Sequence, residues 1–191
     1  MERSSGIGKI MLIASIVIDL VEIIVFIGCK ALRPSVIGPL IDSTFMQNLK
    51  NAYICDKLGS MAIVAVLFSV AATGLLIFEN VMELDSFKGV MISGLLLVMS
   101  VVFFGMGVSH ALPAMTNEPN VVTLTVADTT TVYHGGKSRS RSYHLIMNNG
   151  LDVGVTYEQY SAAKKGDTFY VVCCGSEGIG VFSPSEYRVP G

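Results

Sequence analysis

The sequence predicts a membrane region of three helical spans followed by a small all-β barrel. The first observation behind this prediction is the composition: 51% hydrophobic residues, 15% charged residues and a mean hydropathy of +0.60 are unusual for a soluble chain of 191 residues. The second is a set of three apolar runs, each long enough to cross a hydrocarbon core that needs about 20 helical residues. The third is a change from helical to alternating periodicity after residue 113. We therefore expect a transmembrane domain over residues 1–113 and an all-β domain over 114–191.

The first span, about residues 10–28, carries two carboxylates, Asp19 and Glu22, which lie towards one helix face because they are three residues apart. The 13 Ile, Leu, Val and Phe residues between Ile10 and Ile27 favour insertion by roughly 4 to 8 kcal/mol, and two central carboxylates oppose it by about 5 to 7 kcal/mol. Insertion is therefore nearly balanced. We expect a retained helix rather than a signal peptide, because residues 28–31 lack a small-x-small cleavage site; a lipoprotein at Cys29 is the alternative.

The connection after the first span predicts an amphipathic helix over about residues 35–55, interrupted near its start by Pro34 and Pro39. Two arrangements remain open. The helix could rest in the membrane interface or cover the bundle, or it could pack on the protein itself. Its apolar positions recur three and four residues apart: Ile37, Leu40, Ile41, Phe45, Leu49 and Tyr53.

The second and third spans, about residues 58–78 and 89–112, are expected to form a tight helical hairpin. Small side chains on one face let helix backbones approach closely in a membrane, and both spans carry them. Pro113 ends the third span. The small residues are Ala65, Ser69 and Thr73 in the second span and Gly94, Gly105 and Ser109 in the third.

Everything after about residue 120 is expected to be β-structure. Alternating residues predict strands at 122–126, 143–147, 151–157, 168–174 and 179–182. Asn149-Gly150 predicts a type I′ turn, and Lys165-Gly166-Asp167 predicts another turn. Five short strands in about 75 residues favour a closed or nearly closed barrel of the OB or SH3-like type, because closure removes exposed edges.

A pattern of turns and strands runs through the β-region. Its parts are the run Val121 to Val132, the loop Gly135 to Ser142, Tyr143 to Asn148, the pattern Tyr157-x-x-Tyr160-x-x-x-Lys164-Lys165-Gly166-Asp167, and Phe169-Tyr170-Val171-Val172. This pattern resembles the small domains appended to multi-pass bacterial membrane proteins of uncharacterised function, and the layout is similar to that of NfeD-like proteins, which carry a C-terminal OB-fold domain after membrane helices. The resemblance covers roughly the last 70 residues and implies a β-barrel adaptor that contacts another protein. It supports no residue-level site.

Membrane sidedness is decided weakly by charge, because the first loop and the opposite side carry four and three nearby Lys and Arg residues. Cys173 and Cys174 are adjacent on a predicted strand, so their side chains point to opposite faces and do not suit a mutual disulfide. Free thiols fit a reducing compartment. We therefore expect a multi-pass protein of the cell membrane with its β-domain in the cytoplasm. In the opposite topology, Cys29 and Cys55 would be free to pair.

The intramembrane pair Asp19 and Glu22 allows three hypotheses. It could meet a basic or hydroxyl-bearing residue of a partner helix, bind a proton or cation in a transport subunit, or remain as protonated carboxyls bonded to serines or backbone. The second and third spans contain no Lys or Arg, so hydroxyl groups are the candidate partners within the chain. Those groups belong to Ser69, Thr73, Ser93 and Ser100.

A basic loop offers a second candidate site. Lys137, Arg139 and Arg141 are expected at a hairpin tip, where they are either solvated or in contact with lipid phosphates or an acidic partner. Residues 135–138 read Gly-Gly-Lys-Ser, but a phosphate-binding loop would need a glycine at Thr131 and a following helix.

Metal and enzymatic sites have little support in the sequence. A copper site at Met99, Met106 and His110 and a zinc site at His134 and His144 lack further ligands in suitable positions. No serine lies in a Gly-x-Ser-x-Gly pattern. We therefore expect no cofactor, no metal and no enzymatic activity.

The function expected from the sequence is a membrane-anchored interaction or accessory subunit that presents the β-domain. The alternative is a small transport subunit, or a subunit that relays protons or cations, that uses Asp19 and Glu22. Expected partners are membrane lipid and either another protein or further copies of the chain through the transmembrane helices. Nucleic acid is not expected, because the net charge is -2 and the basic residues are scattered.

Overall fold

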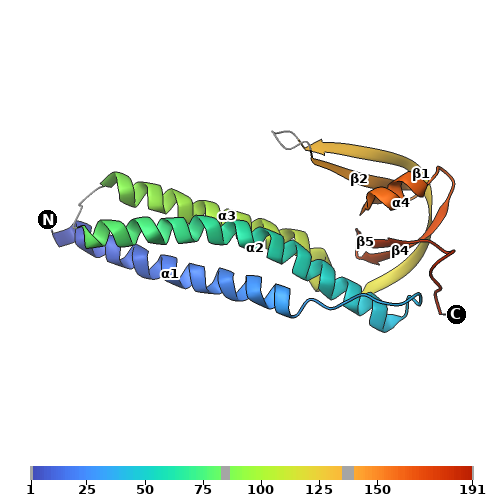
Figure 1. The fold of residues 1–191 in the computed structure, drawn as a ribbon, viewed down its shortest axis with the longest axis horizontal. Coiled ribbons are helices and arrows are strands. Elements are labelled where there is room, and N and C mark those ends of the chain that lie inside the picture. The colour runs from blue at the N-terminus through green and yellow to red at the C-terminus, as the bar shows by residue number, and fades with distance from the viewer. Residues whose placement is uncertain (1, 83–86, 135–139, 191) are drawn as a thin grey trace. The chain divides into compact units, whose positions relative to one another are not determined.

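The chain divides into two compact units, shown in a computed structural model that describes residues 2–82, 87–134 and 140–190 (Figure 1). A helical unit contains Met1–Arg33 and Cys55–Ala111, and a strand-rich unit contains Pro34–Ile54 and Leu112–Gly191. The second junction falls close to the predicted boundary at residue 113. The first does not follow the predicted division, because residues 34–54 group with the strands.

Three long helices dominate the first part of the chain: α1 (Glu2–Ala31), α2 (Ser43–Val81) and α3 (Phe87–Thr116). Each is long and apolar enough to cross a membrane, and each contains one predicted span. The predicted amphipathic helix at 35–55 is not a separate element. Helix α2 begins at Ser43, after a non-helical segment that contains Pro34 and Pro39, and continues without a break into the second span.

The helical unit has small and hydroxyl-bearing side chains inside and large apolar side chains outside. Leu67 and Leu95 are 68% and 64% exposed, whereas alanine and serine side chains are fully buried. Large apolar surfaces of this kind mark contact with a membrane or another protein, and small residues allow membrane helices to pack closely. The fully buried residues of the unit are Ser15, Ala62, Ala65, Ser69, Ala72, Leu76, Ser93, Ser100 and Ala111.

The strand-rich unit contains a curled five-stranded antiparallel sheet in the order β3-β2-β1-β4-β5. The long central strand β1 (Pro119–His134) pairs through residues 119–125 with β4 (Thr168–Cys174) and through residues 126–134 with β2 (Ser140–Met147). The register shifts in β1 between Val126 and Asp128. Such an irregularity increases local twist and bends the strand. The two halves of β1 can therefore pair with different strands of the curled sheet.

The curled sheet is a half-barrel rather than a hydrogen-bonded closed barrel. Its two edges, β3 (Asp152–Val155) and β5 (Glu177–Phe182), contact each other but are not paired. A short helix, α4 (Tyr157–Ala162), stands where the sequence predicted the end of a strand. Thr156 and Gln159 form a capping box at its start, and this Thr-x-x-Gln signal was not used in the sequence analysis.

Turns are present at both predicted positions, but the first is not centred on Asn149 and Gly150 as predicted. The amide of Gly150 donates to the carbonyl of Met147, so Asn148 and Asn149 are the central residues and Gly150, with a φ of 84°, follows them. Gly166 has a φ of 96° in the second turn. Glycine adopts these left-handed conformations without a steric penalty.

Two apolar clusters hold the strand-rich unit together, one on each face of β4. Adjacent Cys173 and Cys174 belong to different clusters, which confirms that their side chains point to opposite faces. One cluster contains Val126, Leu145, Met147, Val153, Val171, Cys173 and Val181, and the other contains Ile41, Phe45, Ala114, Val172, Cys174 and Ile179.

The predicted amphipathic stripe packs on the protein itself. Ile41 and Phe45 are buried in the second cluster, and Leu49 and Tyr53 pack against it. The ring of Phe45 lies 5.2 Å from that of Phe182 at the end of β5. The stripe therefore covers one face of the sheet. Ile37 and Leu40 differ from this pattern, because both precede α2 and are exposed.

Candidate functional site

Glu22 is the centre of a buried polar cluster in the helical unit, and its side chain is only 2% exposed. The hydroxyl of Ser69 on α2 donates to Glu22 Oε2 at 2.8 Å, and the hydroxyl of Ser100 on α3 donates to Oε1. One carboxyl group therefore joins all three long helices. Hydrogen bonds to both oxygens offset part of the cost of burying it.

Asp19 extends the cluster by one turn along α1. Thr73 on α2 donates its hydroxyl to Asp19 Oδ2 at 2.7 Å. The other oxygen, Oδ1, is buried and has no hydrogen-bond partner within the described residues. Asp19 is thus half satisfied, whereas both oxygens of Glu22 have donors.

The partners of both carboxyls in the described part of the chain are hydroxyl groups. Three of the four hydroxyls named from the sequence, those of Ser69, Thr73 and Ser100, make these contacts. The fourth, Ser93, is fully buried, and its Oγ has no partner among residues 2–82, 87–134 and 140–190. Ser93 is two helical turns from Ser100, so both lie on the same face of α3.

The basic hairpin residues are described only in part. Lys137 and Arg139 lie outside the described residues. Arg141, at the start of β2, places its guanidinium 5.2 Å from the ring centre of Tyr133 on the paired strand β1. Arg141 is exposed, as expected for a side chain free to contact an external group.

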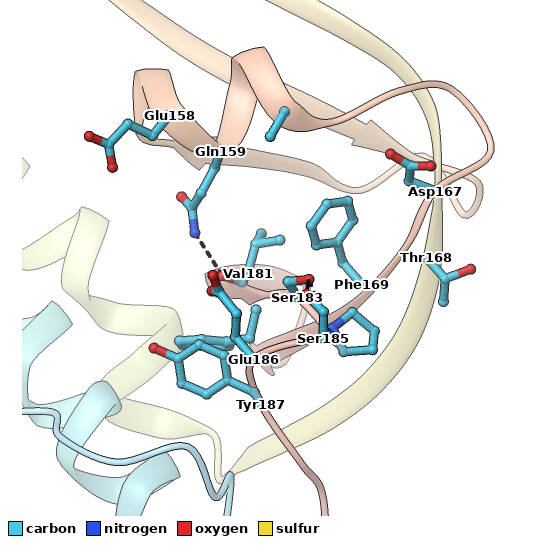
Figure 2. Close-up of a pocket in the computed structure, with 13 residues that line it drawn as sticks. Glu158, Gln159, Asp167, Thr168, Phe169, Val181, Ser183, Ser185, Glu186 and Tyr187 are labelled. Atoms are coloured by element: carbon cyan, nitrogen blue, oxygen red, sulfur yellow. Dashed lines mark hydrogen bonds between the residues drawn. The ribbon is translucent and has the colours of Figure 1, made fainter.

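A cavity of about 690 Å³ lies in the strand-rich unit between α4, the start of β4 and the segment after β5 (Figure 2). Figure 2 shows the amide of Gln159 and the ring of Phe169 directed into it. Gln159 Nε2 donates to the carbonyl of Val181 on the edge strand β5 at 2.9 Å, so the α4 side chain occupies part of that free edge.

The charged groups around this cavity are all negative. Glu158, Asp167 and Glu186 line it, and no Lys or Arg is among the described residues that do. Each carboxylate belongs to an exposed residue. The aromatic residues Phe169, Phe182 and Tyr187 line it too. Carboxylates beside aromatic faces suit a cationic group, which gains charge–charge and cation–π contacts.

The acidic cavity has no counterpart among the sites predicted from the sequence. Its three carboxylates come from a short helix, a turn and the C-terminal segment, and only the fold brings them together. The Thr-x-x-Gln capping signal could have revealed α4. No local pattern links that helix to Glu186.

Comparison with protein-family models, with curated proteins and with solved structures finds no match to this chain. The geometry of the two sites is therefore the basis of the functional proposals below.

Proposed function

We propose that this chain is a membrane-anchored interaction subunit whose β half-barrel binds a basic segment of a partner protein in the acidic cavity. The observation that carries the proposal is the one-sided charge of the cavity lining, which contains Glu158, Asp167 and Glu186 and no Lys or Arg among the described residues. An extended segment that carries Lys or Arg complements this charge. Complementary charge favours such a partner mainly through the association rate and through rejection of acidic competitors.

The aromatic lining narrows the class of partner. Phe169 points into the cavity, and Tyr187 lines it from the C-terminal segment (Figure 2). Aromatic faces attract a Lys or Arg side chain and also pack on its aliphatic stem. Anionic lipid headgroups are disfavoured here, because three carboxylates repel them. We therefore assign the cavity to a protein segment rather than to the membrane surface.

The helical unit serves as the anchor in this proposal. Three apolar helices with outward-facing large side chains support insertion into a membrane. Ser69 and Ser100 supply donors to both oxygens of Glu22 from within the chain. The anchor therefore does not depend on a basic residue of a partner helix for Glu22, and the partner's basic group is assigned to the half-barrel.

Two finer points belong to the same proposal. The half-barrel is of the OB or SH3-like type, which is supported by five short antiparallel strands and by contact between its edge strands. It lies on the cytoplasmic side, which is supported by the free cysteines Cys173 and Cys174, buried on opposite faces of β4.

The proposal is tested with the full-length protein in mild detergent and a fluorescent peptide of alternating Lys and Val residues, with binding followed by fluorescence anisotropy. Replacing both exposed carboxylates, Glu158→Gln and Glu186→Gln, should weaken binding by about twofold to fivefold, because each exposed charge contact contributes a few tenths of a kcal/mol. Asp128→Asn removes an exposed carboxylate that does not line the cavity and should leave binding unchanged.

Two outcomes contradict the proposal. Equal binding of a peptide of alternating Glu and Val residues would show that charge does not select the ligand. Equal weakening by Asp128→Asn and by the paired cavity substitutions would show that the net charge of the protein, not the cavity, attracts the peptide.

A second candidate function is that of a small transport subunit, or of a subunit that relays protons or cations, with Asp19 and Glu22 as the functional residues. The observation in its favour is Asp19 Oδ1, a buried carboxyl oxygen without a partner in the described part of the chain. Full-length protein in liposomes with an internal pH-sensitive dye tests it. Proton flux that Asp19→Asn abolishes and Asp128→Asn preserves would support the relay. Absence of flux, or flux that survives Asp19→Asn, would exclude it.

A further inference from the structure

Two thiols lie together in the helical unit, apart from both candidate sites. Cys29 near the end of α1 and Cys55 on α2 line the same cavity of about 500 Å³. Both are free and partly exposed. The shared cavity therefore places the two cysteines at the same α1–α2 contact.

Gly59 explains why the two helices approach closely at this point. It lies one turn after Cys55 on α2, and a Cβ built on it would stand 3.4 Å from Cys29 Cβ. Cys55 is one helical turn from Gly59, so it lies on the same face of α2, next to the point where Cys29 contacts that helix.

The surroundings of the cavity admit a small charged reagent. Arg33 is half-exposed and pairs with Asp56 at 2.8 Å, and Lys30 lies 5.3 Å from the ring centre of Phe26. All four line the cavity, which gives its lining two cations against one carboxylate. An anionic reagent is therefore attracted to the thiols.

We propose that Cys29 and Cys55 form a reversible thiol–disulfide site that exchanges with small anionic disulfides of the glutathione class. One cysteine thiolate attacks a sulfur of the reagent, forms a mixed disulfide and releases the first reagent thiol. The second cysteine then attacks the protein sulfur of that mixed disulfide, forms the Cys29–Cys55 bond and releases the second reagent thiol. Two protein thiols lose two protons and two electrons, and one reagent disulfide becomes two thiols.

The bond would fix the end of α1 to α2 and close a loop that contains residues 30–54. Closing a loop of this length stabilises a fold by restricting its unfolded chain, unless strain in the folded state opposes the gain. The inference concerns only residues of the helical unit. It does not depend on the acidic cavity, so either proposal can fail without the other.

Full-length protein in mild detergent is incubated with oxidised glutathione, denatured in acid, labelled with a maleimide and weighed by mass spectrometry. We expect two of the four cysteines to lose their label, and a peptide map to show Cys29 joined to Cys55. Dithiothreitol should restore all four labels. The variant with Cys173→Ser and Cys174→Ser is the matched control, and it should lose both of its remaining labels.

Single replacements provide the second measurement. Cys55→Ser should leave Cys29 either labelled or carrying a stable glutathione adduct, because no second thiol displaces the reagent. Wild-type protein that keeps four labels, retains glutathione adducts on both residues, or forms a bond involving Cys173 or Cys174 would overturn the proposal. So would a link between two chains instead of within one.

Discussion

The hydroxyl groups that hold Glu22 can be removed with little change in packing. Ser69→Ala and Ser100→Ala together delete the donors to both carboxyl oxygens. Alanine is close to serine in volume, so the fully buried positions stay filled. The perturbation therefore isolates the hydrogen bonds between the three helices from their apolar contacts.

The expected cost follows from the two contacts. Interhelical hydrogen bonds in membranes contribute about 0.6 kcal/mol on average and up to about 1.7 kcal/mol, so two give about 1–3 kcal/mol. Glu22 is 2% exposed, and water cannot replace the lost donors without entering the bundle. We therefore expect the double variant to lower the free energy of unfolding by about 2–3 kcal/mol.

The assay is unfolding of the full-length protein by added dodecyl sulfate in mild-detergent micelles, with proteolysis as the readout. Ser15→Ala is the matched control. Ser15 is fully buried on α1, but its hydroxyl donates to the carbonyl of Leu12 in the same helix, so its loss should have little effect. In a Glu22→Leu background, the cost of the two serine replacements should largely disappear. An equal loss for Ser15→Ala, or an unchanged cost in the Glu22→Leu background, would refute the assignment.

Two further predictions concern close packing and pH. A Cβ on Gly107 of α3 would stand 2.8 Å from Met61 Cβ on α2, so Gly107→Ala should destabilise the helical unit by about 1–3 kcal/mol in the same unfolding assay. Gly105→Ala is the control and should have little effect, because a Cβ there would have nothing within 4 Å. Similar costs for both variants would contradict the close approach at Gly107. Burial raises the pKa of Cys173 and Cys174 above the ordinary 9.0. The unfolded thiols therefore lose their protons first, and the stability that these groups contribute below pH 9 should decline as the pH rises through their folded pKa. Thermal unfolding across this range, compared with the variant Cys173→Ala and Cys174→Ala, measures the effect; an identical pH dependence in both proteins would rule it out.

The helices and most strands could be predicted because their signals are local. Apolar runs of sufficient length marked α1, α2 and α3, and alternation marked β2 and β4. The continuity of α2 differs from the prediction, because the fall in hydrophobicity before residue 58 indicates a boundary between two helices. The hydropathy changes before residue 58, but this part of α2 contains no proline and no glycine cluster that would end the helix.

The contacts of the polar cluster were partly predictable, and the acidic cavity was not. The absence of Lys and Arg from the second and third spans left a short list of donors for Asp19 and Glu22, and three of those four hydroxyls are used. The cavity depends on the curl of the sheet and on the position of α4. Both depend on long-range pairing of β1, which a single sequence does not fix.

The carboxylates of the helical unit and those of the acidic cavity differ in their hydrogen bonding and exposure. We therefore expect their replacement to have different effects. Inside the helical unit, Glu22 has donors on both oxygens, so its replacement should change stability more than binding. In the strand-rich unit, Glu158 and Glu186 are exposed beside aromatic side chains, so their replacement should change binding more than stability. Asp19 is the exception, because its buried Oδ1 has no partner within the described residues. A variant of Asp19 that gains stability without losing peptide binding would show that this orphaned oxygen is a cost to the anchor. That result would favour the second candidate function, in which Asp19 acts in a relay, over a role in recognition by the half-barrel.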